Sequence, residues 1–150
     1  MNLFSALRSA PTPAVVLGFG GLIPFVGLAL LVVFVPVPWY AFWLGTLSHY
    51  GALILSFVGA LHWGYAVHIG ARDARAWVQY GWSVLPCLIG WVSLQLPVWT
   101  ALRVQAAALV VCYSFDRMMA RSQSLPAWLL PLRAALTAIG ATSLLCASLA

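Results

Sequence analysis

Five apolar stretches, each long enough to cross a bilayer as a helix, are the feature that most constrains how this chain can fold. They lie at about 14–35, 40–69, 76–96, 98–119 and 127–149. A transmembrane helix needs roughly 20 mostly apolar residues, because it must cross a hydrocarbon core about 30 Å thick. The connections between the stretches are too short to form separate domains. The sequence therefore predicts one all-α domain, residues 1–150, built as a bundle of five transmembrane helices.

The charged residues are too few to cover a water-soluble protein. They make up 6% of the chain, against 64% for the apolar residues, whereas soluble domains carry about 25% charged residues. The same composition excludes a disordered chain, which would be poor in apolar and aromatic residues. The net charge of +5 is spread too thinly for the basic patch of a nucleic-acid-binding protein. We therefore expect the lipid bilayer, and not nucleic acid, to be the partner of this surface.

Arginines in alternate connections predict the orientation of the helices. They lie before the first stretch, between the second and third, and at the connection between the fourth and fifth: Arg8, Arg72, Arg75, Arg117 and Arg121. The other connections and the tail carry no Lys or Arg. Because Lys and Arg accumulate in cytoplasmic loops, we predict a cytoplasmic N-terminus and a C-terminus outside.

The first stretch is expected to stay in the membrane rather than be removed as a signal peptide. Its apolar run is longer than the roughly 7–15 residues of a signal-peptide core, and Pro24 interrupts it. In the second stretch, Ala52, Ser56, Ala60 and Gly64 recur every four residues. This stripe of small side chains predicts close contact with another helix.

Two ionisable residues inside the last two stretches are placed to pair. Asp116 and Arg133 lie at nearly equal distances from the connecting loop, about 120–126, so an antiparallel hairpin brings them to the same depth. An ionised side chain at the centre of a membrane helix costs about 2.5–3.5 kcal/mol on insertion scales, and pairing would cancel most of that cost. We expect an Asp116–Arg133 pair. It is either a structural clamp that closes the hairpin or a charge pair that takes part in function.

His62 is the residue most strongly marked as a candidate for ligand binding. It lies about two turns from the predicted cytoplasmic boundary, and in lipid it needs a hydrogen-bond partner, for which Gln79, Ser83 and Asp116 are candidates. If the helices that carry them are neighbours, these four residues and Arg133 form one polar cluster on the inner side. Two interpretations stay open. Either His62 makes a plain interhelical hydrogen bond, or it faces a pocket open to the inner leaflet and contacts a ligand head group or a proton.

The sequence offers no pattern for catalysis, metal binding or a cofactor. His49 and His62 are about 13 residues apart, which turns their rings about 220° from each other on a helix, so they do not form the paired ligands of haems. Cys87, Cys112 and Cys146 lie in apolar runs without CxxC spacing and are expected to be packed as free thiols. HExxH, GxSxG and paired carboxylates do not occur. We therefore predict no catalytic residue, no metal ligand and no cofactor.

Three parts of the sequence resemble an uncharacterised family of membrane proteins. They are residues 20–25 (GGLIPF), residues 56–64 (SFVGALHWG), and Pro126–Trp128 followed by Leu132, Arg133, Leu136 and Thr137. The family consists of small bacterial multi-pass proteins related to animal transmembrane protein sixty-nine. The resemblance covers most of the chain, and its one mild departure is Gly59-Ala60-Leu61-His62, where the family has Gly-Gly-Ile-His. It implies a multi-pass protein of the bacterial inner (plasma) membrane and implies no reaction.

These observations favour a non-catalytic integral membrane protein with a structural or assembly role. Its partners would be other membrane proteins or a second copy of the chain. The alternative is a binder or carrier of a small hydrophobic or ionisable ligand, such as a quinone, at the inner polar cluster. A membrane enzyme is the least favoured hypothesis, because the polar groups within the apolar stretches are few and can be paired structurally.

Overall fold

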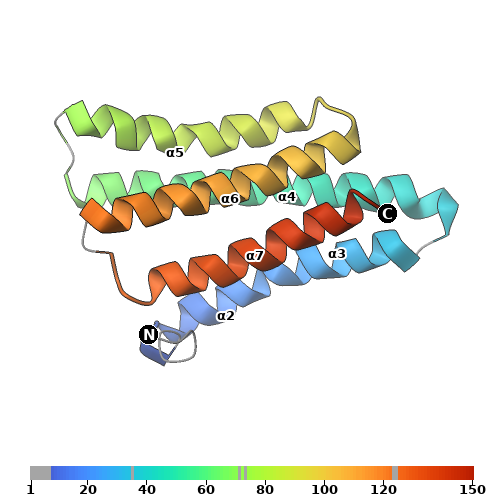
Figure 1. Ribbon diagram of the computed structural model, residues 1–150, viewed down its shortest axis with the longest axis horizontal. Helices are drawn as coiled ribbons and strands as arrows, with labels where there is room; N and C mark the ends of the chain where they lie inside the picture. The colour runs from blue at the N-terminus through green and yellow to red at the C-terminus, as the bar shows by residue number, and fades with distance from the viewer. Residues whose placement is uncertain (1–7, 35, 71, 73, 123–124) are drawn as a thin grey trace.

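The computed structural model describes residues 8–34, 36–70, 72, 74–122 and 125–150, and within these ranges the regular structure is helical (Figure 1). The elements are α2 (Thr12–Gly20), α3 (Leu22–Phe34), α4 (Val37–His68), α5 (Ala74–Ser93), α6 (Val98–Ser122) and α7 (Leu129–Ala147). The prediction of an all-α chain is therefore confirmed. Each of the five predicted stretches forms helix, with ends that shift by up to three residues.

The first stretch is divided into two helices at Gly21. The N–H of Gly21 still donates to the Leu17 carbonyl at 2.9 Å, but its own carbonyl accepts a hydrogen bond from the Tyr50 hydroxyl at 2.7 Å. Pro24 lacks the N–H that would bond to the carbonyl of Gly20 in a continuous helix. The break therefore follows from Pro24, and Tyr50 of α4 satisfies a carbonyl at the break.

Four helical segments are long and apolar enough to cross a membrane: Thr12–Phe34, Pro38–His68, Val98–Arg121 and Leu129–Ala147. The fifth predicted span forms α5, which is not among them. Its first half carries Gln79, Tyr80 and Ser83, which lower its mean hydropathy. The structure thus supports four spans by length and composition, and α5 stays a predicted fifth.

The helices run roughly side by side along the long axis of the molecule (Figure 1). α4 packs most extensively against α5 and also contacts α3 and α6, while α7 packs against α6 and α3. The start of α2, the end of α4 and the end of α6 lie at one end of the bundle, and the C-terminus lies toward the other (Figure 1). The arginine-bearing connections therefore share one end of the bundle. The side chains of Arg8, Arg72, Arg117 and Arg121 are exposed; that of Arg75 lies outside the described part.

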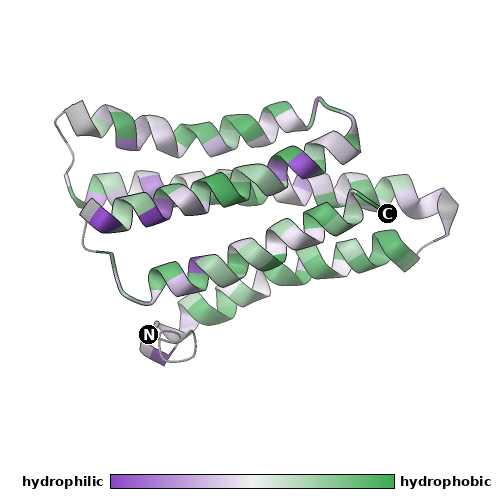
Figure 2. Cartoon of the chain, in the orientation of Figure 1, coloured by the Kyte–Doolittle hydropathy of each residue, from purple (hydrophilic) through white to green (hydrophobic). Residues whose placement is uncertain are grey.

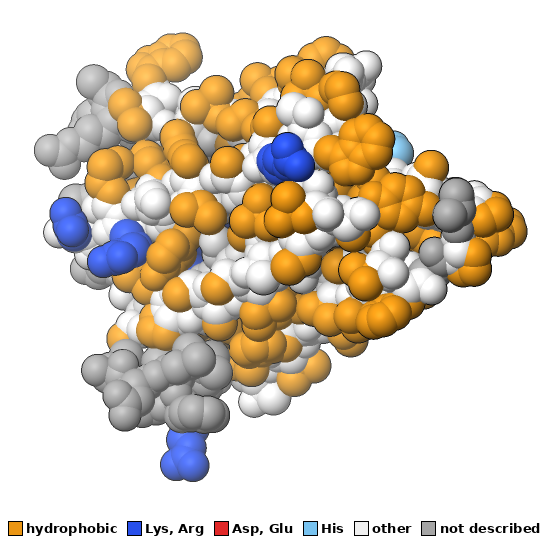
Figure 3. All heavy atoms as spheres, turned by 45° about the vertical axis from the view of Figure 1, so that its right-hand side comes forward, with side chains coloured by type: hydrophobic (Ala, Val, Ile, Leu, Met, Phe, Trp, Pro, Cys, Tyr) orange, Lys and Arg blue, Asp and Glu red, His pale blue; other side chains and the backbone are white. Residues whose placement is uncertain are grey.

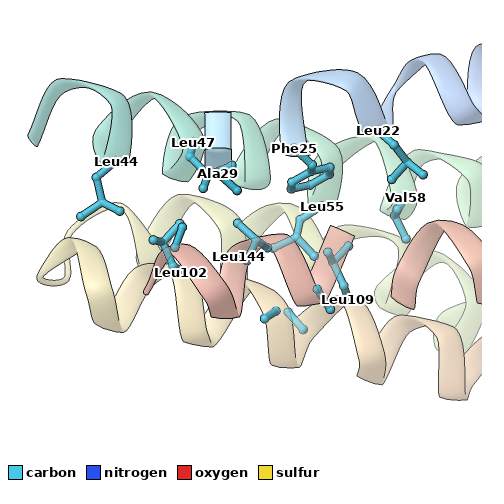
Figure 4. Packing of buried hydrophobic residues seen from close by; sticks show 14 of the residues in the cluster. Leu22, Phe25, Ala29, Leu44, Leu47, Leu55, Val58, Leu102, Leu109 and Leu144 are labelled. Carbon is cyan, nitrogen blue, oxygen red and sulfur yellow. The ribbon is translucent and has the colours of Figure 1, made fainter. Parts of the chain in front are cut away.

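Apolar side chains fill the centre of the bundle and also cover its outside. Leu44, Leu47, Leu55, Leu102 and Leu144 are completely buried and meet between α4, α6 and α7 (Figure 4). On the exterior, Leu17, Phe34 and Trp77 are at least 75% exposed. Hydrophobic residues run along every helix (Figure 2) and cover most of the visible face, with basic side chains mainly toward one end (Figure 3). Such an exterior fits hydrocarbon rather than water.

Two glycines let α4 and α5 pack closely against each other. A Cβ on Gly59 would collide with the backbone carbonyl of Ser83, and a Cβ on Gly90 would lie 3.0 Å from the Ala52 carbonyl oxygen. The predicted small-residue stripe is correct at Ala52 but wrong at its far end, because a Cβ added at Gly64 would meet nothing within 4 Å. Helices that run nearly parallel stay in contact through positions seven apart, such as Ala52 and Gly59, rather than four apart.

Candidate functional site

A three-residue ionic cluster lies inside the bundle near its arginine-rich end. Asp116 of α6 is at its centre. The Nε2 atom of His62, on α4, lies 3.0 Å from its Oδ1 atom, and the Nε atom of Arg133, on α7, donates to its Oδ2 atom at 2.8 Å. The three side chains are only 10–11% exposed. One carboxylate therefore links three helices and uses both oxygens.

Aromatic rings hold the histidine of this cluster. The His62 ring meets Phe115 edge to face, with centroids 5.5 Å apart, and Phe115 stacks on Trp82 of α5 at 4.1 Å. Because Phe115 precedes Asp116 on α6, one helical turn supplies both the acceptor and the ring that orient His62. The side-chain direction of His62 is thus fixed by packing as well as by hydrogen bonding.

A cavity of about 190 Å³ opens beside the cluster. His62, Asp116 and Arg133 supply its polar wall, and its remaining lining is mainly apolar: Val58, Leu61, Tyr65, Met119, Leu125 and Leu129. An apolar pocket with a few convergent polar groups is the usual form of a small-molecule site. His62 therefore makes an interhelical contact and also borders a cavity, and its contact with a ligand head group or a proton stays a prediction.

The structure brings together three of the five residues that the sequence marked. The predicted contact between Asp116 and Arg133 is confirmed, and of the candidate partners for His62 it is Asp116 that lies in contact. Gln79 and Ser83 are buried on α5, but neither lines the cavity. The hydroxyl of Ser83 donates to the Tyr80 carbonyl at 2.6 Å. Ser83 meets α4 at Gly59, whereas the contacts of His62 are with Asp116 and Phe115 of α6.

A second polar cluster, farther along the bundle, is one that sequence reasoning missed. Gln105 of α6 is completely buried. Its side-chain nitrogen donates to the carbonyl of Ser48 at 2.9 Å and to the hydroxyl of Ser93 at 2.9 Å. It thereby joins α4, α5 and α6. Its side-chain oxygen lies against Gly51, where a Cβ would collide with it. The only signal in the sequence was a glutamine within an apolar stretch, and the sequence does not show which helices are its neighbours.

Arg103, which is exposed, also contacts the end of α7. The sequence places it one turn into the fourth stretch, where it would reach outward to lipid head groups. In the structure its Nη2 atom donates to the backbone carbonyl of Ser148 at 3.1 Å. Ser148 directly follows α7, so this cation satisfies a carbonyl at a helix C-terminus, where positive charge is favourable.

The cluster has the chemistry to bind a polar group but not to hold a metal ion. Within the described residues, no three His, Cys, Asp or Glu side chains gather as ligands, and an adjacent arginine would repel a cation. Arg133 engages Asp116 through Nε, and its terminal nitrogens make no hydrogen bond within the described part of the chain. These nitrogens are donors that a ligand in the cavity could use.

Comparison with known proteins places the whole helical region in one family. Residues 10–149 match a family described as a protein of unknown function (DUF3429). Transmembrane protein 69 of Xenopus tropicalis is 35% identical over an alignment of 144 residues, which covers 93% of this chain and 54% of the frog protein. Transmembrane protein 69 of Mus musculus is 31% identical over 90 residues, 59% of this chain and 36% of the mouse protein.

The chain thus spans about half the length of the frog relative that it matches, 54% of it. No solved structure matches the chain. The apolar helices and the relatives named as transmembrane proteins agree that this is a membrane protein.

Proposed function

The chain belongs to the DUF3429 family, and from this premise we propose that it binds a small ligand within the membrane, in the cavity beside His62, Asp116 and Arg133. The observation that carries the proposal is the position of three ionisable groups on the wall of an otherwise apolar cavity of about 190 Å³. Ionisable groups in membrane helices are costly, and they commonly mark substrate or ion pathways. A purely structural pair would not need to border a cavity.

A structural role is a second proposal, and it is supported by the same cluster. Asp116 contacts His62 of α4 and Arg133 of α7, so it stabilises the arrangement of three helices whether or not a ligand binds. Assembly with other membrane proteins, or with a second copy of the chain, stays a prediction. Stable subunits that co-purify with the protein would favour assembly, whereas a small molecule retained by it would favour binding.

We further propose five spans in the bacterial inner membrane, with the N-terminus in the cytoplasm. The arrangement of the connections supports this orientation, because those that carry arginine share one end of the bundle (Figure 1). We expect Ala150 to lie outside the cytoplasm, so a reporter that is active only there should be active when fused after Ala150. We expect Arg75 to lie inside, so a reporter that is active only in the cytoplasm should be active when fused after Arg75. Cytoplasmic reporters at both Arg75 and Ala150 would mean that α5 does not cross the membrane.

Ligand binding is tested by native mass spectrometry of protein extracted with its lipids. The wild-type protein is expected to retain a small molecule of defined mass. His62→Leu removes the polar nitrogens from the cavity wall and should reduce that occupancy by about tenfold, which corresponds to about 1.4 kcal/mol. His49→Leu is the matched control: His49 lies on the same helix, is exposed and bonds to the Gly45 carbonyl at 2.7 Å, so its loss should leave occupancy unchanged. A wild-type protein without any bound molecule would contradict the proposal.

A further inference from the structure

A second cavity adjoins the first at Arg133. It has a volume of about 260 Å³ and lies between α2, α3, α4, α6 and α7. Val58 and Arg133 line both cavities. Apart from Arg133 and Thr137, the second cavity has no polar side chain in its lining. The two spaces therefore meet at a side chain that offers hydrogen-bond donors, with a polar wall on one side and an apolar chamber on the other.

The apolar cavity borders the surface that faces lipid. Leu17 and Phe57, which belong to its lining, are 75% and 60% exposed. They come from α2 and α4, so part of the cavity lining reaches the apolar exterior of the bundle. A molecule dissolved in the bilayer can reach this cavity without crossing the polar ends of the bundle.

The charges at the junction favour an uncharged head group. Arg133 and Asp116 carry opposite charges and neutralise each other. An additional anion would be left uncompensated in a region of low dielectric, which is costly. The terminal nitrogens of Arg133, which lack a hydrogen bond within the described residues, need only an acceptor. A neutral carbonyl oxygen provides one.

We infer that the two cavities form one site for a neutral, membrane-dissolved amphiphile, whose carbonyl head group binds Arg133 and whose hydrocarbon chain occupies the apolar cavity. This inference rests on the proposed function and adds the class of ligand and its route of entry. An empty apolar cavity forfeits van der Waals contacts that a chain restores. A benzoquinone with an alkyl chain has the required chemistry.

The test measures binding to the full chain in lipid nanodiscs with three probes: decyl-substituted benzoquinone, methyl-substituted benzoquinone and decanoate. The dissociation constants are obtained from ligand-induced shifts in unfolding temperature. Decyl-benzoquinone is expected to bind more tightly than decanoate. If decanoate binds more tightly, the inference of a neutral head group is overturned.

Variants then separate the chain from the head group. Thr137→Leu fills the apolar cavity from α7 without adding charge, and it should weaken decyl-benzoquinone about tenfold while leaving methyl-benzoquinone unchanged. Ile54→Phe narrows the same cavity from α4 and should also weaken decyl-benzoquinone without affecting methyl-benzoquinone. With two such variants, the test does not depend on one that folds poorly. Ala138→Leu is the matched control, because Ala138 is exposed on the same helix and lies outside the lining of both cavities.

The possible outcomes distinguish this inference from the proposed function. If the cavity-filling variants bind decyl-benzoquinone as the wild type does, while Arg133→Gln weakens both quinones, the head-group site stands and the chain site is overturned. If Arg133→Gln binds all probes as the wild type does, the inference is overturned, whereas the proposed function fails if the wild-type protein retains no small molecule. If Thr137→Leu and Ile54→Phe weaken the binding of decyl-benzoquinone but not of methyl-benzoquinone, the result supports both the inference and the proposed function.

Discussion

Replacing Asp116 by alanine should sharply reduce the yield of folded protein. Asp116 is the shared partner of His62 and Arg133, so its removal leaves one cation without a counter-charge and one imidazole without its acceptor. Removing one member of a buried ion pair costs about 3–5 kcal/mol, a large part of a typical stability of about 5–15 kcal/mol. The measurement is the monodisperse fraction after detergent extraction, together with the unfolding temperature.

Two further variants establish whether the loss comes from the pair. Asp116→Ala combined with Arg133→Ala should recover part of the loss, because both charges are then absent, although His62 still lacks its acceptor. Arg117→Ala removes an exposed charge from the same helix and should change stability by at most about 0.5 kcal/mol. If the loss in the double variant equals the sum of the two single losses, Asp116 and Arg133 do not interact.

Gly59→Ala should destabilise the contact between α4 and α5. The added Cβ would collide with the backbone carbonyl of Ser83 and would lie 3.5 Å from the Pro86 side chain. A backbone carbonyl cannot rotate away as the end of a side chain can, so the two helices must separate. Overpacking of this kind costs about 1–3 kcal/mol, and the unfolding temperature of the purified protein should fall accordingly.

Gly64→Ala is the matched control for this prediction. Gly64 lies on the same helix, and a Cβ there would meet nothing within 4 Å. Alanine favours helix over glycine by about 0.8–1.0 kcal/mol, so Gly64→Ala should leave the unfolding temperature unchanged or raise it. Equal unfolding temperatures for Gly59→Ala and Gly64→Ala would show that α4 and α5 do not approach each other at Gly59.

The sequence was sufficient to predict the helices, because a chain in lipid must satisfy its backbone hydrogen bonds locally. The five apolar stretches are all helical, and the Asp116–Arg133 contact could be predicted because it depends only on an antiparallel hairpin of adjacent helices. Pro24 likewise gave a local signal for the division of the first stretch, although the break itself lies at Gly21. Each of these features is decided within one helix or between consecutive helices.

Which residues share a site was decided by tertiary packing. His62, Gln79 and Ser83 have similar predicted depths, but depth does not specify which face of a helix meets which neighbour. Ser83 of α5 meets Gly59 of α4, whereas His62, one turn along α4, meets Asp116 of α6. Gln105 was missed for the same reason, since its partners Ser48 and Ser93 come from two other helices. Rotation about each helix axis follows from side-chain packing across the whole bundle, which the sequence of one segment does not contain.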